Sequence, residues 1–270
     1  YVPALQQSDS PASGTSAFFG GIIATWQPEA QTIGQSNPTF RQIQLTARTL
    51  EFYTVASNQL LQDNAVALDT LLTTLFKEGM AWFYDYYILR GTGADQPLGV
   101  LNSPALYSQS RDTATTFKFV DVANMMAHFL MTSWTKGCWI MHPSVIPQLF
   151  QLADSTNGSL IWLSQFGTSG QGGLASKMPL TLVGLPIYFT EKVPKLGTAG
   201  DVSLVDLSKY IVGDRMAIQI ETSPHVLFLT NQMVWRIIAR WDGQPWLDQP
   251  ITLADGAGNY QVSPFVGLAA

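Results

Sequence analysis

Three glycines follow an arginine in the stretch RGTGADQPLGVLN, residues 90–102, and glycines beside a cation are typical of phosphate-binding loops. A dinucleotide-binding loop needs a strand before the glycines and a helix after them, so that the phosphate meets the positive end of the helix. Here the hydrophobic pattern predicts a long helix before the glycines, and no lysine follows Gly93 or Gly99. A phosphate would face the negative end of that helix. We interpret the stretch as a turn that ends the helix at Gly91.

Cys138 and His142 are the other residues whose spacing suggests chemistry. A thiol and an imidazole form a nucleophile pair when the fold brings them together, which leaves a Cys/His hydrolase as a remote alternative. One cysteine and one histidine do not supply the four ligands of a structural zinc site. Asp85 lies in an aromatic run at 82–87, a setting that can raise the pKa of an acid, but we favour a position facing solvent or a neighbouring cation. No G-x-S-x-G or H-E-x-x-H motif occurs, so the sequence predicts no enzyme, no metal site and no cofactor.

The composition favours a chain that buries surface against partners. Only 12% of the 270 residues are charged, 46% are hydrophobic, and eight are tryptophan. The net charge is −5 without any basic block, so a dedicated nucleic-acid-binding face is not expected. The single cysteine excludes an internal disulfide, and no apolar run reaches the roughly 18 residues that span a membrane. The chain begins at Tyr1 rather than Met, which fits a processed precursor or a longer chain.

The first fifty residues predict an arm followed by a hairpin. Residues 1–17, rich in Ser, Pro, Ala and Gln, lack a core of their own and should be disordered or lie across a neighbour. We expect a strand over 18–26, a polar loop over 27–39, and an alternating strand over 42–52 whose phase changes at a bulge or at a change of packing environment. A lone hairpin is marginally stable, so this one must lean on another surface.

A long amphipathic helix should follow, capped by Asp63 or Asn64 and extending over about 64–90. The remaining helices and strands interleave without regular βαβ alternation, which indicates the α+β class. The expected elements are helices at 116–133 and 143–153, strands at 138–141, 180–190, 202–205 and 210–212, a glycine-rich loop at 157–177, two or three long strands within 217–240, a turn at Asp242-Gly243, and an apolar tail at 263–268.

Taken in chain order, these parts resemble the major capsid proteins of tailed bacteriophages, which have the Hong Kong phage capsid fold. The resemblance covers about residues 16 to 268, and no single motif in it is specific. The segments that carry it are WQPE at 26–29, SNPTF at 36–40, VAS at 55–57 with LLQD at 60–63, GTG at 91–93 with QPLGVL at 96–101, MHP at 141–143, GLP at 184–186 and RWDG at 240–243.

The resemblance implies a domain plan with a long spine helix at about 64–90 and a glycine loop at 91–102. Its parts are an N-terminal arm at 1–17, an extended hairpin loop at 18–50, a peripheral domain at 51–102 and 215–255, and an axial domain at 103–214 and 256–270.

The resemblance also implies a structural function. Copies would self-assemble into pentamers and hexamers that form the icosahedral head around the double-stranded DNA of a tailed phage, built in the host bacterial cytoplasm. Further partners would be a portal, a scaffolding segment or protease, and a decoration protein. Contact with DNA would be non-specific, and no membrane partner is implied. The implied inter-subunit contacts are Trp26, Glu29, Phe40, Arg41, Gly91, Gly93, Gln96 and Pro97.

Some relatives crosslink their subunits through a lysine on the extended loop and an asparagine on a peripheral strand, assisted by a glutamate. Asn231 stands where that asparagine would be. The first lysine of the chain is Lys77, however, so the extended loop has none. Ile238 occupies the assisting position and cannot transfer a proton. We therefore expect no covalent crosslink.

Within the same fold, the alternative is an encapsulin-type shell of a cellular compartment. A protein cargo would mark an encapsulin, whereas packaged DNA or a tail vertex would mark a phage head. The N-terminal arm and the long hairpin favour the phage.

Overall fold

The computed structural model describes residues 1–5, 26, 28–30, 32, 35, 37–38, 40–63, 68–152, 181–253 and 260–270. These residues form an α+β fold that divides into two compact units. Unit 1 consists of Tyr1–Gln44, Val100–Tyr210 and Pro245–Ala270, and unit 2 consists of Leu45–Gly99 and Ile211–Gln244. Apart from Trp26, the strand expected at 18–26 lies outside the described residues, as do the loop expected at 157–177 and the expected cap Asn64.

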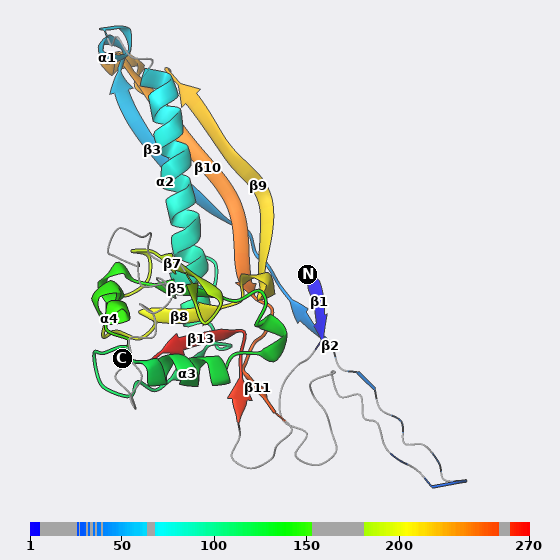
Figure 1. Ribbon diagram of the computed structural model, residues 1–270. Coiled ribbons are helices and arrows are strands. Elements are labelled where there is room, and N and C mark those ends of the chain that lie inside the picture. The colour runs from blue at the N-terminus through cyan, green and yellow to red at the C-terminus, as the bar shows by residue number, and fades with distance from the viewer. Residues whose placement is uncertain are drawn as a thin grey trace. The chain divides into compact units, whose positions relative to one another are not determined.

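Unit 2 contains one long helix beside a three-stranded sheet (Figure 1). The helix is α2 (Leu68–Arg90), and a short helix, α1 (Asn58–Asp63), precedes it. The sheet has the order β3-β10-β9, with β3 at Arg48–Ser57, β10 at Gln232–Pro245 and β9 at Tyr210–Ser223. The long helix is thus confirmed, and two long strands, β9 and β10, cover most of the stretch 217–240. The separate strand expected at 210–212 is the beginning of β9.

Alternation in β10 explains how the sheet and the helix of unit 2 pack. Trp235, Ile237 and Ala239 are buried together because every second side chain of a strand points to the same face. They form a cluster with Phe76 and Met80 of α2, which share a helix face because they are four residues apart. This cluster is the hydrophobic core of unit 2.

Unit 1 contains a six-stranded mixed sheet of order β4-β13-β8-β5-β7-β6. β5 lies parallel to β7 and antiparallel to β8, and β13 lies between β4 and β8. The C-terminal tail therefore forms an interior strand. The six strands are β4 (Tyr107–Gln109), β5 (Cys138–Met141), β6 (Thr181–Leu182), β7 (Leu185–Phe189), β8 (Val202–Val205) and β13 (Phe265–Leu268).

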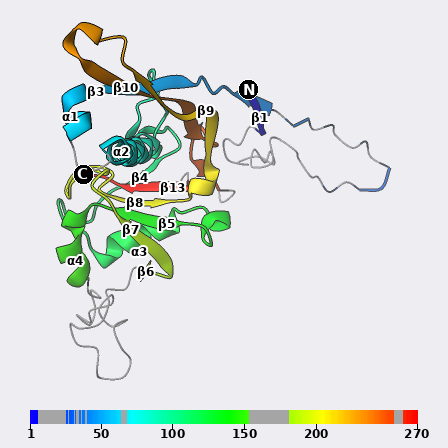
Figure 2. The same cartoon turned by 90° about the horizontal axis from the view of Figure 1, so that it is seen from above.

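Helices α3 (Phe119–Ala127) and α4 (Ile146–Phe150) lie on one side of β5 and β7 (Figure 2). Val122 of α3 and Leu149 of α4 join Trp139 of β5 in the core of unit 1. Both helices are shorter than predicted. The remaining short elements are the 3-10 turns η2 (Val100–Asn102), η3 (Met131–Ser133), η4 (Pro143–Val145), η6 (Leu207–Lys209) and η7 (Phe228–Thr230), and strands β11 (Ile251–Thr252) and β12 (Gln261–Val262), which pair with each other.

The first residues of the chain form a strand that pairs within the chain. β1 (Val2–Leu5) pairs antiparallel with β2 (Phe40–Ile43), and Ala4 and Ile43 are buried. The single strand predicted over 42–52 is consequently wrong, because β2 and β3 belong to different sheets. Of the two explanations for the change of phase, the change of packing environment holds and the bulge does not, because the chain passes from one sheet to another.

Two further predictions are corrected. The single strand expected over 180–190 is a hairpin of β6 and β7, with Val183 (φ 52°) and Gly184 (φ 77°) at its turn. The turn expected at Asp242-Gly243 lies inside β10. There the Asp242 carboxylate accepts hydrogen bonds from the backbone N–H of Thr46 (2.6 Å) and from that of Gly243 (2.8 Å). Asp242 thus fixes the position of the backbone at Thr46, just before β3 begins.

Candidate functional site

The glycine loop at the end of α2 uses its own amides for its own structure. The N–H of Gly91 donates to Tyr87 (2.9 Å), as the last helical turn requires. The N–H of Gly93 donates to the carbonyl of Pro97 (3.2 Å), and that of Gly99 donates to the carbonyl of Gly91 (2.8 Å). Because backbone carbonyls occupy these donors, the loop does not form a phosphate cradle. The interpretation as a helix-ending turn is confirmed.

Close approach of two backbone segments explains the glycines of this loop. A Cβ on Gly91 would overlap the carbonyl oxygen of Pro97 and lie 2.6 Å from that of Tyr87. Gly93 has a φ of +78°, which favours glycine over residues with a side chain. The carbonyl of Gly243 in β10 accepts from the N–H of Leu98 at 2.8 Å and so fixes the returning strand of the loop.

Only part of this loop is available to a neighbouring molecule. Gly91 and Pro97 are buried within the chain, so their role is to shape the loop. Gln96 is half-buried and its side-chain amide donates to the hydroxyl of Thr92. Gly93 is exposed, as is Asp95, which pairs with Arg48 of β3 at 2.8 Å. The exposed tip of the loop lies between Thr92 and Asp95.

The other expected contact residues lie in unit 1. Trp26, Glu29 and Phe40 are exposed, and their side chains are available for contact with another molecule. Arg41 instead pairs with Asp248 of the same chain at 3.3 Å. The structure therefore separates three available contact residues from one that is engaged within the subunit.

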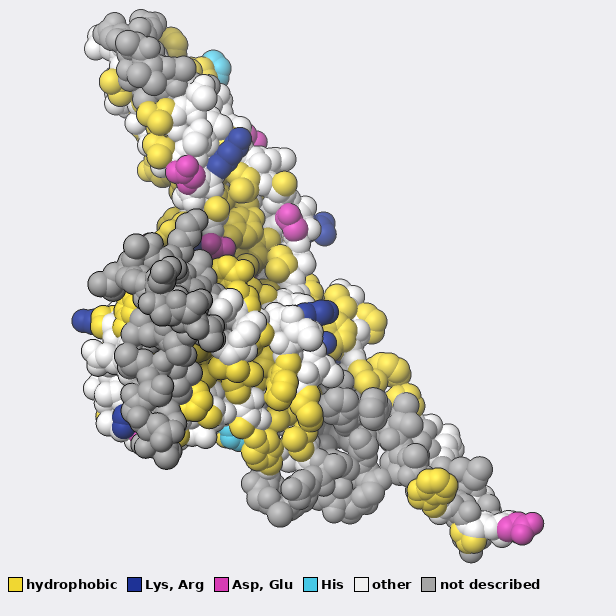
Figure 3. Space-filling view, viewed as in Figure 1, with side chains coloured by type: hydrophobic (Ala, Val, Ile, Leu, Met, Phe, Trp, Pro, Cys, Tyr) yellow, Lys and Arg dark blue, Asp and Glu magenta, His cyan; other side chains and the backbone are white. Residues whose placement is uncertain are grey.

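An exposed apolar segment between β9 and β10 was not predicted from the sequence. We call its three most exposed large side chains the apolar tip: Val226 (70% exposed), Phe228 (76%) and Leu229 (98%). Hydrophobic side chains also predominate over charged ones on the face of unit 2 seen in Figure 3. The sequence feature that marks this segment is the run SPHVLFLT at 223–230, which contains a proline and lies inside the stretch where alternating strands are expected.

Asn231 closes the apolar tip. It has a left-handed backbone (φ 53°), and its side-chain oxygen accepts from the side-chain amide of Asn58 at 2.7 Å. Its carbonyl also accepts from the N–H of Asn58 at 3.1 Å. Asn231 thus joins the end of β3 to the start of β10.

The two other residues considered for a crosslink lie elsewhere in unit 2. Lys77 lies on α2, and Ile238 is half-buried in β10.

Cys138 and His142 do not form a nucleophile pair. They lie at opposite ends of β5, a separation of roughly 13 Å for four residues of extended chain. Burial, and secondarily the charge of Asp206, raises the pKa of the Cys138 thiol to about 11, whereas a nucleophilic thiolate needs a lowered pKa. The imidazole of His142 caps η4 by accepting from the N–H of Ser144.

Within the described residues, no group of three or more His, Cys, Asp or Glu side chains is arranged to hold a metal ion. No helix in the described ranges is long and apolar enough to cross a membrane.

Solved structures with the same fold include capsid chains of GTA particles. The capsid chain of an empty GTA particle is 16% identical with a TM-score of 0.73, and the alignment covers 100% of this chain and 85% of that one. The capsid chain of the native GTA particle is 17% identical with a TM-score of 0.71, covering 92% and 81%. A chain from Mycobacterium phage Bobi is 16% identical with a TM-score of 0.62, covering 99% and 84%.

No curated protein sequence matches the chain. The family model described as Phage capsid family, however, matches residues 8–256, which is most of the sequence. The chain belongs to the phage capsid family.

Proposed function

We propose that this capsid subunit is the major head protein of a tailed phage, forming pentamers and hexamers of an icosahedral shell around double-stranded DNA. The observation that carries the proposal is the family match over residues 8–256. The fold is also shared along the whole chain with the capsid chain of the empty GTA particle, and that capsid was computed with C5 symmetry. Five-fold symmetry is the symmetry of a pentamer vertex in such a shell.

The surface of the subunit supports extensive contact with other copies. Large apolar side chains in water are unfavourable, and exposed apolar clusters mark interaction sites. The apolar tip of unit 2 and Phe40 of β2 are such side chains. We assign contact with neighbouring subunits to them, to Trp26 and Glu29, and to the exposed part of the glycine loop around Gly93.

We assign the peripheral domain expected at 51–102 and 215–255 to unit 2, with α2 as its spine helix. We likewise assign the axial domain expected at 103–214 and 256–270 to unit 1, which also contains residues 245–255. The proposed further partners are a portal, a scaffolding segment or protease, and a decoration protein. The low charge of the chain suits non-specific contact with packaged DNA, because a strongly basic inner surface would bind it tightly.

Electron microscopy of the purified, expressed chain tests this function. Closed shells with pentameric vertices, and DNA-filled heads with a tail in lysates of the source phage, are the expected result. Shells that carry a protein cargo and no tail vertex would instead identify an encapsulin. A protein that stays monomeric at high concentration would contradict the proposal.

A further inference from the structure

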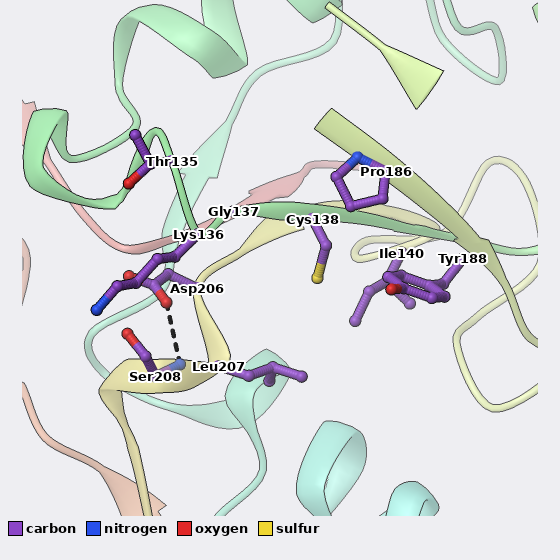
Figure 4. A pocket seen from close by; sticks show the side chains of 10 residues that line it. All are labelled: Thr135, Lys136, Gly137, Cys138, Ile140, Pro186, Tyr188, Asp206, Leu207 and Ser208. Atoms are coloured by element: carbon purple, nitrogen blue, oxygen red, sulfur yellow. Dashed lines mark hydrogen bonds between the residues drawn. The ribbon is translucent and has the colours of Figure 1, made fainter. Parts of the chain in front are cut away.

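A cavity of about 580 Å³ lies on one face of the unit 1 sheet, over β5 and β7. Trp139 and Ile187 point to the opposite face, where they join the core with α3 and α4. Cys138 and Ile140, one position out of phase, therefore line the cavity, as do Pro186 and Tyr188. Figure 4 shows Asp206 and Lys136 on one side of this cavity, Ile140 and Tyr188 on the other, and Cys138 between them.

Most of the surface inside the cavity is apolar, and its rim is exposed. Tyr188 of β7 is 59% exposed and Leu207 of η6 is 43% exposed, although both side chains are large and carry hydrophobic surface. Ile140 is buried at the base. A chain that leaves such a depression open to water loses the stabilisation that covering it would give.

A buried carboxylate lies in the wall of this apolar depression. Asp206 is 1% exposed, and its Oδ1 accepts from the N–H of Ser208 at 3.0 Å. Its Oδ2 is buried and has no hydrogen-bond partner among the described residues. In the described part of the chain, no Lys, Arg or His nitrogen lies within 4.0 Å of the Asp206 carboxylate, so this carboxylate forms no ion pair there. Asp206 is one of the residues that line the cavity.

We infer that this cavity receives an arginine or lysine side chain from a neighbouring copy of the chain in the assembled shell. The inference rests on the self-assembly proposed above. The aliphatic stem of such a side chain matches the apolar surface of Leu207 and Ile140, and a guanidinium would also stack on the ring of Tyr188. Its charged head would supply the donor that Oδ2 of Asp206 lacks. A buried carboxylate without a partner is costly, so the contact stabilises the assembly rather than the free subunit.

Lys136 provides the competing explanation, because it lines the same cavity and is exposed. If Lys136 itself neutralised Asp206 by swinging inward, Lys136→Ala and Asp206→Asn would impair the protein alike. If a neighbour supplies the cation, only Asp206→Asn should impair assembly. Asn is nearly isosteric and keeps an oxygen acceptor for the N–H of Ser208. We expect Asp206→Asn to raise the subunit concentration for half-maximal shell assembly by about tenfold or more, and Lys136→Ala to leave it unchanged.

A photo-crosslinking amino acid at position 207 tests the occupant directly and does not depend on the folding of an Asp206 variant. In shells of the otherwise unchanged chain, irradiation should join position 207 to a peptide of a second copy that contains an arginine or lysine at the reacted site. The same protein as free subunits should give no such product.

Three results would overturn the inference: shells that give no crosslink between copies, a crosslinked peptide without a nearby cation, or equal effects of Lys136→Ala and Asp206→Asn. If the unchanged chain builds no shells at all, the proposed function fails first. Normal shells without occupancy of the cavity reject this inference alone.

Discussion

Nη2 of Arg111 lies 2.8 Å from both carboxylate oxygens of Asp201, and the two side chains are 1% and 0% exposed. Every other polar group of the pair is also used. Arg111 donates to the carbonyls of Thr116 (2.8 Å) and Ala269 (3.0 Å), and Asp201 accepts from the N–H of Val202 at 2.8 Å. The pair therefore ties the segment before α3, the start of β8 and the C-terminus together inside unit 1.

We predict that Arg111→Met strongly destabilises the subunit. The substitution leaves Asp201 charged and buried without its partner, which costs about 3–5 kcal/mol. The free energy of unfolding from a urea titration measures this loss. Lys118→Met is the matched control, because it breaks the Lys118–Asp112 pair, whose side chains are 47% and 41% exposed. A control effect as large as that of Arg111→Met would show that burial is not the cause.

Gly91→Ala and Gly79→Ala should change stability in opposite directions. The added Cβ at Gly91 overlaps backbone atoms of Pro97, so the loop must move and the subunit should lose about 1–3 kcal/mol. At Gly79, inside α2, a Cβ meets nothing within 4 Å, and alanine should add about 0.5–1 kcal/mol. Thermal unfolding of both variants measures the two shifts. If both substitutions changed the unfolding temperature by the same amount, the glycine loop would have to accommodate the new Cβ at no cost, and the prediction would be wrong.

Patterns of apolar residues within one segment predicted the elements that such local patterns determine. β5 was predicted with its observed bounds, because four consecutive apolar residues are all buried in an interior strand. α2 was predicted because its apolar spacing persists over many turns. Pairings between distant segments were not predictable in the same way. Nothing in the sequence of Val2–Leu5 indicates that its partner is Phe40–Ile43.

Tertiary contacts also reversed some local signals. Asp242-Gly243 is a common turn sequence, but the carboxylate of Asp242 bonds to Thr46 from within a continuous strand. Val183 disfavours a positive φ, so its turn carried no signal, although Gly184 follows it. Similarly, the sequence of the apolar tip is compatible with a strand, and only the course of β9 and β10 shows that these side chains are exposed.

The raised pKa of Cys138 predicts a loss of stability in alkali. The pKa of the thiol is about 9.0 in the unfolded chain, whereas burial raises its pKa to about 11 in the folded protein. Between these values the folded state holds more protons, so the stability of the protein falls as pH rises, by about 2–3 kcal/mol in all. Cys138→Ala removes the titrating thiol. The difference in unfolding free energy between the unchanged protein and Cys138→Ala should therefore shrink from pH 8 to pH 11. A pH-independent difference would contradict the assignment.

Shells of this protein should contain no covalent bond between subunits. The side-chain oxygen of Asn231 accepts from Asn58, the 26–47 segment has no lysine, and Ile238 cannot act as a base. Purified shells boiled in denaturing buffer should run as a single band at the monomer mass. A ladder of oligomers that survives boiling and reduction would refute the prediction.

The apolar tip should be needed for assembly but not for folding. Leu229 is almost fully exposed, so Leu229→Asp removes no core contact and should leave the unfolding temperature of the subunit unchanged. In a shell, the new charge would have to be desolvated at an apolar contact, and we expect at least a tenfold loss of shell yield, about 1.4 kcal/mol per contact or more. Val183→Asp places the same charge on an exposed turn of unit 1, where a positive φ suits aspartate, and should assemble normally. Sedimentation and electron microscopy of the three proteins compare the yields. Normal shells from Leu229→Asp would remove the apolar tip from the subunit interface.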